Sequence, residues 1–180
     1  HGIHIGPDDS VWVSDSEAHV VMKFRPEGKL LMTLGNRDRP SNTYLGRPFN
    51  MPTNVAVAPT GEIYVSDGYG NKRIHKFSAQ GELLLSWGDW GKGPGQFSIP
   101  HSLAIDSAGR MYICDRHNNR IQVLDANGKY ISEWKGLHAP SDIRVVGDLA
   151  YVTEQGPSEG GQGPDRVGIW TLDGKLLSSW

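Results

Sequence analysis

The segment PHSLAIDSAGRMYICD, residues 100–115, decides the fold because its pattern recurs four times along the chain. Its second residue occupies what we call the slot position, and an apolar stretch follows it. An acidic residue comes fourteen positions after the slot in three copies and thirteen positions after it in the fourth. Self-similarity at a period of about 40 to 50 residues is typical of propellers and solenoid arrays. The slot residues are His1, Thr53, His101 and Ser141, and the acids are Asp15, Asp67, Asp115 and Glu154.

Each copy contains four short stretches with the character of β-strands. β-Branched and aromatic residues alternate with polar ones between turn residues, which is the pattern of a half-buried strand. A glycine turn separates the last two stretches, as at Asn127-Gly128, because a tight hairpin needs positive φ. The turn glycines are Gly28, Gly81, Gly128 and Gly174. In the second copy we expect strands over residues 55–58, 63–66, 73–77 and 83–87.

Four short antiparallel strands in each copy form one blade of a β-propeller. The sequence therefore predicts an all-β fold, a single propeller region over residues 1–180 with almost no helix. Blades pack face to face, so we expect large apolar residues between them, including Trp87, Trp134 and Trp180. The expected blades are at about 1–36, 50–90, 97–135 and 138–180.

Composition narrows the classes of function. The 23 glycines and 11 prolines favour many turns. A net charge of −2 gives no polyanion-binding signature, so nucleic acid is not an expected partner, and no apolar run is long enough to cross a bilayer. The lone Cys114 excludes an intramolecular disulfide framework. Because the chain opens at His1 without methionine, we expect a processed, trimmed or partial protein.

A glycine-rich stretch over residues 155–165 lies inside the fourth copy. It resembles a phosphate-cradling loop in its glycine content alone. Such a loop needs a strand before it and a helix after it, and neither is expected here. We therefore interpret the stretch as a flexible insertion.

Three motifs of the third copy, residues 93–100, 112–116 and 119–123, resemble NHL-repeat β-propellers, and the resemblance extends over the whole chain. Within that group, residues 66–74, 100–104 and 115–116 are similar to peptidyl-α-hydroxyglycine α-amidating lyases. This resemblance implies a six-bladed propeller, of which about four blades are present. It also implies cleavage of a peptidyl-α-hydroxyglycine to a peptide amide and glyoxylate, at a zinc ion held on the axis by three histidines.

The two slot histidines fit that zinc site. In a six-bladed ring, equivalent positions on alternate blades lie ~120° apart about the axis, and His1 and His101 belong to alternate blades. Three histidines with an open fourth position are a ligand set of catalytic zinc. We therefore expect His1 and His101 as zinc ligands, with the third histidine on a blade outside this chain. The remaining histidines, which we expect to be structural, are His4, His19, His75, His117 and His138.

The resemblance assigns three further roles. Tyr69 matches a tyrosine beside the metal that helps to deprotonate the substrate hydroxyl, and a phenol needs nearby cations or a metal for that. Arg116 matches an arginine that faces the site, where a guanidinium fork suits a carboxylate. The backbone carbonyl of Ile3 matches a ligand of a calcium ion, which makes calcium a second candidate cofactor. A turn aromatic at Tyr69 and a structural salt bridge at Arg116 remain open alternatives.

The repeated acids have a structural interpretation. Asp15, Asp67 and Asp115 recur in every ordinary NHL blade, so we expect them to accept backbone hydrogen bonds at strand ends. Arg73 and Arg120 repeat in step with the acids and are expected to be structural as well.

Several alternatives stay open. The family's second active-site arginine would precede His1, its third zinc ligand would follow Trp180, and its disulfides have no counterpart. A non-catalytic NHL propeller that binds a protein or ligand is the main competing function. A calcium-dependent lactonase-type site would need Asn54 and Asp142, which strand alternation turns away if His101 faces inward. The four blades form either an open arc or a closed ring, and open blade edges would allow self-association. The resemblance favours a secreted or periplasmic protein with a peptide or small-molecule substrate.

Overall fold

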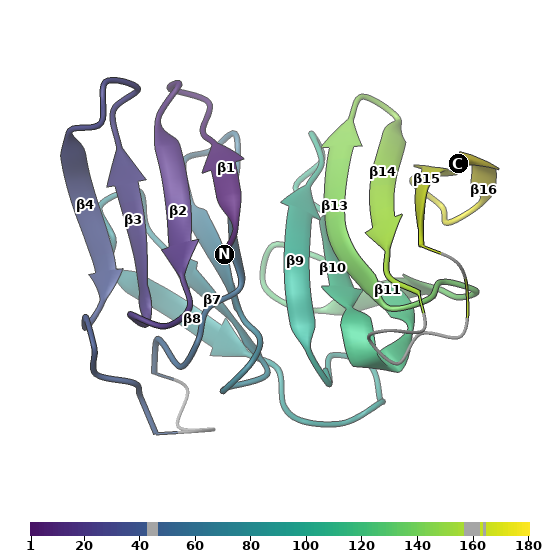
Figure 1. The fold of residues 1–180 in the computed structure, drawn as a ribbon, viewed down its shortest axis with the longest axis horizontal. Coiled ribbons are helices and arrows are strands. Elements are labelled where there is room, and N and C mark those ends of the chain that lie inside the picture. Colours follow the sequence, from purple (N-terminus) through teal and green to yellow (C-terminus); the bar gives the residue numbers. More distant parts are fainter. Residues whose placement is uncertain (43–46, 157–162, 164) are drawn as a thin grey trace. The chain divides into compact units, whose positions relative to one another are not determined.

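The structure, a computed structural model, describes residues 1–42, 47–156, 163 and 165–180. Its strands form four antiparallel sheets of four strands each (Figure 1). The strands of the first two sheets are β1 (Ile3–Ile5), β2 (Val11–Asp15), β3 (Val20–Phe24), β4 (Leu30–Gly35), β5 (Asn54–Val57), β6 (Ile63–Asp67), β7 (Arg73–Phe77) and β8 (Leu83–Trp87). Those of the other two are β9 (Pro100–Ile105), β10 (Met111–Asp115), β11 (Arg120–Leu124), β12 (Tyr130–Trp134), β13 (Pro140–Val146), β14 (Leu149–Glu154), β15 (Arg166–Thr171) and β16 (Leu176–Ser179).

Within every sheet the strands follow one another in chain order, which is the arrangement of a propeller blade. The all-β prediction is confirmed. One short 3₁₀ turn, η1 (Arg116–Asn118), is the helical element in the described part of the chain. No helix among the described residues has the length and apolar character needed to span a membrane. The glycine-rich insertion predicted over residues 155–165 lies largely outside the described residues.

The chain divides into two compact units, His1–Asp89 and Trp90–Trp180, each with two blades. In the first unit a shared apolar core fills the space between the blades. Trp12 from β2 packs there with Phe49, and Val65 and Phe77 come from the second blade. These four side chains are at most 3% exposed, so this core supplies most of the burial that holds the two sheets together.

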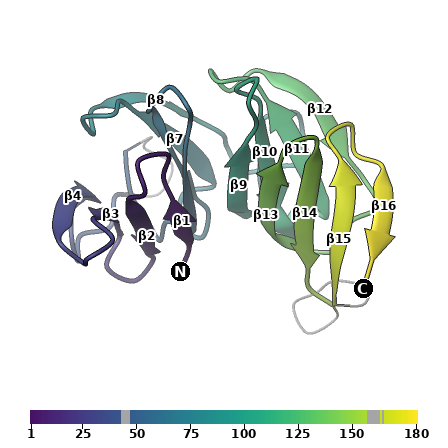
Figure 2. The ribbon, with the colours of Figure 1, turned by 90° about the horizontal axis from the view of Figure 1, so that it is seen from above.

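The second unit repeats this arrangement with a larger aromatic core. Trp134 and Trp170, from neighbouring blades, stack with ring centroids 6.0 Å apart. Tyr112 and Cys114 of β10 lie in the same core and are fully buried, and burial raises the pKa of the Cys114 thiol well above its usual value. The first strands of the two blades, β9 and β13, lie side by side (Figure 2).

The hairpins between the third and fourth strands have the predicted geometry. Their four glycines have φ between 85° and 90°, a region that an L side chain rarely adopts. The positive φ closes the hairpin, so each fourth strand returns alongside the third. The fourth strand is always the outer edge of its sheet, and the first strand is the inner edge shared with the next blade in the same unit.

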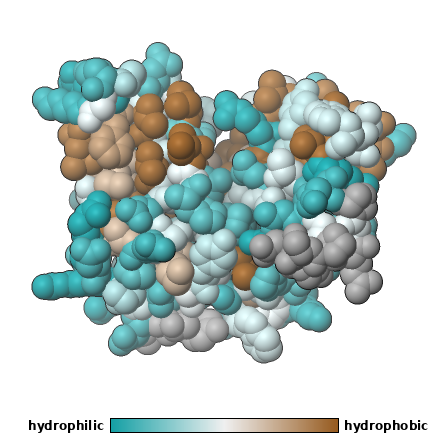
Figure 3. Space-filling model, in the orientation of Figure 1, coloured by the Kyte–Doolittle hydropathy of each residue, from teal (hydrophilic) through white to brown (hydrophobic). Residues whose placement is uncertain are grey.

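The three tryptophans expected between blades differ in their exposure. Trp134 is 2% exposed, as predicted, but Trp87 is only half-buried and Trp180 is 69% exposed. Trp134 ends the outer strand β12 and is covered by Trp170 of the fourth blade, whereas Trp180 follows the outer strand β16 of the fourth blade itself. Apolar side chains also reach the surface over the first sheet (Figure 3), where Ile3 and Ile5 of β1 are 71% and 48% exposed.

The slot residues of the third and fourth blades lie in local irregularities of their sheets. In the third blade Cys114 pairs with Ser102 and Asp115 pairs with Pro100, so His101 is an extra, bulged residue. Ser141 is bulged in the same way between the pairs of Pro140 and Asp142. A bulge bends the strand and re-aims its side chains, and bulges are common beside functional sites. In the third and fourth blades the slot is therefore a position where the first strand redirects a side chain.

Candidate functional site

The slot histidine of the first blade reaches the neighbouring blade. Its backbone nitrogen donates to the Ser14 carbonyl at 2.5 Å, which fixes the residue beside the end of β2. Its ring atom Nδ1 lies 2.7 Å from the carbonyl oxygen of Thr53, the slot residue of the second blade. The Ser14 hydroxyl donates to the same carbonyl at 2.9 Å. His1 is therefore held by groups from both blades of its unit.

The slot histidine of the third blade makes the same contact in the other unit. His101 Nδ1 lies 2.6 Å from the carbonyl oxygen of Ser141, the slot residue of the fourth blade. A carbonyl only accepts, so in both histidines Nδ1 carries the hydrogen and Nε2 keeps its lone pair. Metal-binding histidines are oriented in this way, with one ring nitrogen donating to a carbonyl and the other facing the metal. Both histidines thus have the tautomer that a metal ligand needs.

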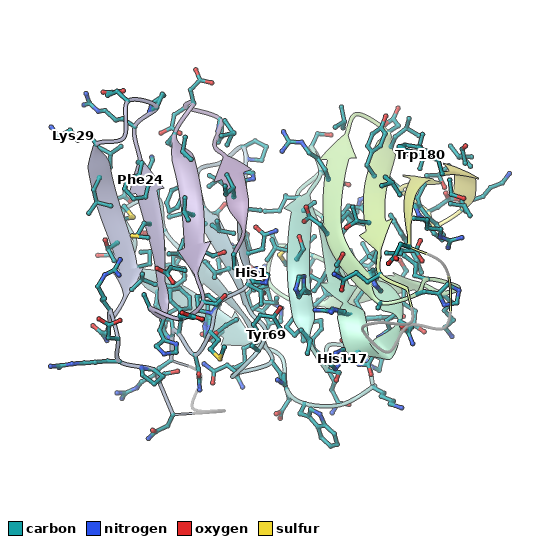
Figure 4. All side chains as sticks on the ribbon, viewed as in Figure 1. His1, Phe24, Lys29, Tyr69, His117 and Trp180 are labelled. Atoms are coloured by element: carbon teal, nitrogen blue, oxygen red, sulfur yellow. The ribbon has the colours of Figure 1, made fainter. Side chains whose placement is uncertain are left out.

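Tyr69 lies directly against His1. Its hydroxyl donates to His1 Nε2 at 3.1 Å, and the two rings meet edge to face with centroids 5.4 Å apart. Tyr69 comes from the turn after β6, and Figure 4 shows both side chains at the same end of the unit. The backbone of the turn is held by Lys72, whose ammonium donates to the Tyr69 carbonyl. The structure thus brings together two of the five residues singled out in the sequence.

Arg116 belongs to the matching turn of the third blade. It begins η1, is 6% exposed, and its backbone nitrogen donates to the Ile99 carbonyl at 2.9 Å. The pKa of His101 lies below its usual value, chiefly because of burial, and the Arg116 charge acts in the same direction. The Ser141 carbonyl and Asp142 oppose this shift without reversing it. His101 is therefore neutral at neutral pH, with a guanidinium within electrostatic range.

Ser102, the residue after the slot of the third blade, also contacts the fourth blade. Ser102 donates from its hydroxyl to Asp142 Oδ1 at 2.5 Å, so both His101 and Ser102 direct their side chains toward the first strand of the fourth blade. The prediction that strand alternation turns Asn54 and Asp142 away if His101 faces inward stays a prediction. The bulge at His101 interrupts the alternation, and it depends on pairing with β10, which the local pattern of β9 does not reveal.

The backbone carbonyl of Ile3 lies at the edge of the first sheet. Ser14 donates its backbone hydrogen to the Gly2 carbonyl at 2.9 Å, so the next carbonyl along the strand, that of Ile3, points away from β2. Since β1 is the first strand of its sheet, no strand of the same blade lies on that side. The carbonyl is placed where a cation could meet it.

The repeated acids have structural roles, as predicted. Three of them accept a backbone hydrogen from the residue three positions before the slot of the same blade. Arg120 donates from Nε to Asp115 at 2.9 Å, and His75 Nε2 lies 3.1 Å from Asp67 with both side chains fully buried. The three acids and their backbone donors are Asp67 with Asn50, Asp115 with Ser98, and Glu154 with His138.

No group of three or more His, Cys, Asp or Glu side chains within the described ranges lies close enough together to hold a metal ion.

The profile of the NHL repeat matches residues 49–77 and 97–124, which are parts of the second and third blades. The chain carries NHL repeats. The structure extends the same four-stranded unit to the first and fourth copies.

Among curated proteins, peptidyl-alpha-hydroxyglycine alpha-amidating lyase 1 of Drosophila melanogaster is 36% identical over 175 residues, 90% of this NHL-repeat chain and 30% of the relative. Peptidyl-glycine alpha-amidating monooxygenase of Mus musculus is also 36% identical, over 89% of this chain and 18% of the relative. NHL repeat-containing protein 3 of Homo sapiens is 35% identical, over 84% of this chain and 48% of the relative. The chain thus spans about a fifth to a half of the length of these relatives.

Solved structures agree on the fold. An inactive variant of virginiamycin B lyase from Staphylococcus aureus superimposes with a TM-score of 0.69 at 17% identity, over 100% of this chain and 54% of the other. Hydrazine synthase of Kuenenia stuttgartiensis gives a TM-score of 0.72 at 15% identity, over 99% and 47%. Proteins with such different names share the propeller architecture, so these likenesses concern the fold alone.

Proposed function

We propose that this chain is part of a zinc-dependent lyase that cleaves peptidyl-α-hydroxyglycine compounds to a peptide amide and glyoxylate. One observation carries the proposal: His1 and His101, at equivalent slots, each donate from Nδ1 to the slot carbonyl of the next blade. An ordinary surface histidine has no reason to repeat this contact. The similarity to amidating lyases at 36% identity supports the same interpretation.

The donor set fits zinc. Neutral imidazole is a preferred zinc ligand, and carbonyl-bound Nδ1 fixes the ring so that Nε2 faces the ion. The lowered pKa of His101 helps, because a protonated imidazole cannot bind a metal. Bound zinc would supply a Lewis acid that polarises the hydroxyl oxygen of the substrate. We propose the Ile3 carbonyl as a calcium ligand on the weaker ground of its edge position.

The chain's own residues supply the rest of the chemistry. In the phenolate form that bound zinc would favour, Tyr69 would accept the proton of the substrate hydroxyl, the bond between the hydroxylated carbon and the amide nitrogen would break, and the carbon–oxygen double bond of glyoxylate would form. The departing nitrogen takes up a proton, so no water is consumed. Arg116 binds the carboxylate of the glycine unit, for which a planar guanidinium is well shaped.

The test is to incubate the purified full-length protein that contains this chain with an N-acylated peptide ending in α-hydroxyglycine and to measure both products at a pH where the substrate is stable. We expect amide and glyoxylate in equal amounts, faster than in a protein-free control. A zinc-loaded protein that releases neither product would contradict the proposal. That result would favour a binding propeller, the alternative that the name of NHL repeat-containing protein 3 leaves open.

A further inference from the structure

A second concave site lies in the Trp90–Trp180 unit beside η1. Its volume is about 320 Å³, at the lower end of the range for ligand pockets, so it suits one side chain rather than a large cofactor. It is lined mainly by side chains that carry charge or hydrogen-bonding groups, and we call it the basic pocket. The lining residues are Lys92, His117, Asn118, Arg120, Glu133 and Lys135, together with Asn119.

The charges of the basic pocket do not cancel. Arg120 donates to Asp115 behind the pocket at 2.9 Å and to Glu133 at 2.8 Å. Glu133 also pairs with Lys135 at 3.0 Å, and these cations hold the pKa of its carboxyl below the usual value. Lys92 has no ion pair among the described residues and is exposed. Three fixed cations thus face two carboxylates, in a chain whose net charge is −2.

The basic pocket adjoins the candidate site through a single turn. Arg116 and His117 are consecutive in η1, where successive side chains point about 120° apart. Arg116 is buried and acts on His101, whereas the exposed His117, which Figure 4 labels, is one of the residues that line the pocket. The candidate site and the basic pocket are therefore joined by two consecutive residues of one turn.

The rim of the pocket is suited to a peptide. Asn118 donates from Nδ2 to the Gly91 carbonyl at 2.8 Å, which anchors the loop before β9 beside η1. Trp90, the residue before Gly91, is 66% exposed. Exposed tryptophans are common in protein recognition surfaces because the indole covers a large apolar area and still offers a donor.

We propose that the basic pocket binds an acidic side chain of the peptide, on the N-terminal side of the hydroxyglycine. The inference rests on the proposed function for the identity of the ligand, and it adds a preference that the chemistry at the slot does not require. A carboxylate would complete the set of charges by pairing with Lys92 and with the Lys135 ammonium.

The expected preference is modest because the lysines are in contact with water. An exposed ion pair contributes about 1.4- to 5-fold in affinity, so two lysines together give about 2- to 25-fold. Salt should reduce the effect, since exposed pairs are screened.

The experiment uses α-hydroxyglycine peptides that carry one glutamate at successive upstream positions, each with a glutamine counterpart. At one position we expect kcat/KM to favour glutamate by about 2- to 25-fold. A Lys92→Glu/Lys135→Glu variant should lose or invert this preference while it cleaves the glutamine peptides at the wild-type rate. A Lys129→Glu/Lys175→Glu variant is the matched control, because it changes the same charge at hairpins on the other end of the strands and should keep the preference.

A second measurement tests peptide binding at the basic pocket separately from the reaction. Binding of a fluorescent glutamate peptide without hydroxyglycine, compared with its glutamine counterpart, needs no turnover. Tighter glutamate binding that the pocket variant alone abolishes supports the pocket even if no peptide is cleaved, and then the lyase proposal alone fails. Cleavage with equal rates for every glutamate and glutamine pair overturns the pocket while the lyase proposal stands.

Discussion

Tyr69 donates its phenol hydrogen to Nε2 of His1 at 3.1 Å, although 68 positions separate the two residues in the chain. That nitrogen is the atom that the proposed function assigns to zinc. The phenol oxygen therefore already occupies the region next to the ligand atom, as a group acting on a metal-bound substrate must. His1 is held from its other side by the Thr53 carbonyl, so the ring cannot turn to avoid this arrangement without losing a hydrogen bond.

Replacement of Tyr69 by phenylalanine removes one hydroxyl and keeps the ring. We expect kcat to fall by about 10²- to 10⁴-fold, the usual contribution of a general base. Zinc content should be unchanged, because the Tyr69 hydroxyl contacts the same His1 nitrogen as the proposed zinc ion and does not help the ion to bind. Steady-state kinetics with metal analysis of the same samples checks both points. A variant that turns over at the wild-type rate would remove Tyr69 from the mechanism.

Replacement of His101 by alanine should lower the zinc content of the protein. The imidazole supplies a ligand nitrogen whose orientation the Ser141 carbonyl fixes, and the alanine side chain has no atom that can bind zinc. His138→Ala is the matched control, since the contact of His138 with Glu154 uses the backbone nitrogen, which alanine retains. Equal zinc content in the wild-type protein and the His101→Ala variant, measured by mass spectrometry of the metal, would contradict the assignment.

Replacement of Arg116 by alanine should reduce kcat/KM by roughly 10- to 150-fold, the loss expected for a charged hydrogen bond of about 1.5–3 kcal/mol. Arg116→Lys keeps the charge but loses the planar fork, so its activity should lie between those of alanine and arginine. Thermal unfolding of both variants separates a lost contact from a lost fold, because the side chain is buried. Full activity in the alanine variant would show that Arg116 is structural.

Asp106 makes stability depend on pH. Burial raises the pKa of its carboxyl, but hydrogen bonds from Arg110 and Tyr112 outweigh burial and leave the pKa below 3.8. A carboxyl with a lowered folded pKa stabilises the fold above its unfolded pKa and loses that contribution as the pH falls through the folded value. Asp106→Asn should therefore cost about 1.5–3 kcal/mol at pH 7 and progressively less below pH 3.8. Urea unfolding of both proteins at pH 7 and pH 3 measures the difference, and a constant difference would refute the role of the charge.

The regular parts of the blades could be predicted from sequence because their signals are local. The strands Arg73–Phe77 and Leu83–Trp87 have the predicted bounds, since Gly81 at φ 87° fixes the turn between them. The first strand of that blade begins one residue earlier than expected, at Asn54. The structural roles of the acids could also be predicted from their repetition, because a group repeated in every blade is expected to stabilise the structure that all blades have in common.

The bulge at the slot could not be predicted, because it is a property of two strands. Nothing within residues 100–105 shows that His101 lacks a partner on β10, and the orientation of Ser102 toward Asp142 depends on that extra residue. The repeat pattern groups Trp180 with Trp134, but Trp134 is buried because Trp170 of the next blade covers it, which the pattern does not show. The residues of the basic pocket come from a loop, a turn and an outer strand, so no single sequence motif predicts the pocket.

The most direct test of the central claim is the rate of glyoxylate release from an α-hydroxyglycine peptide by one protein preparation in three states. These states are zinc-loaded, stripped with a chelator, and stripped and then resupplied with zinc. The account predicts release in the first state, loss of at least about 10²-fold in the second as expected when an essential metal is removed, and recovery in the third. The His101→Ala variant should not recover with zinc. Equal rates in all three states, or no release in any of them, would contradict the claim.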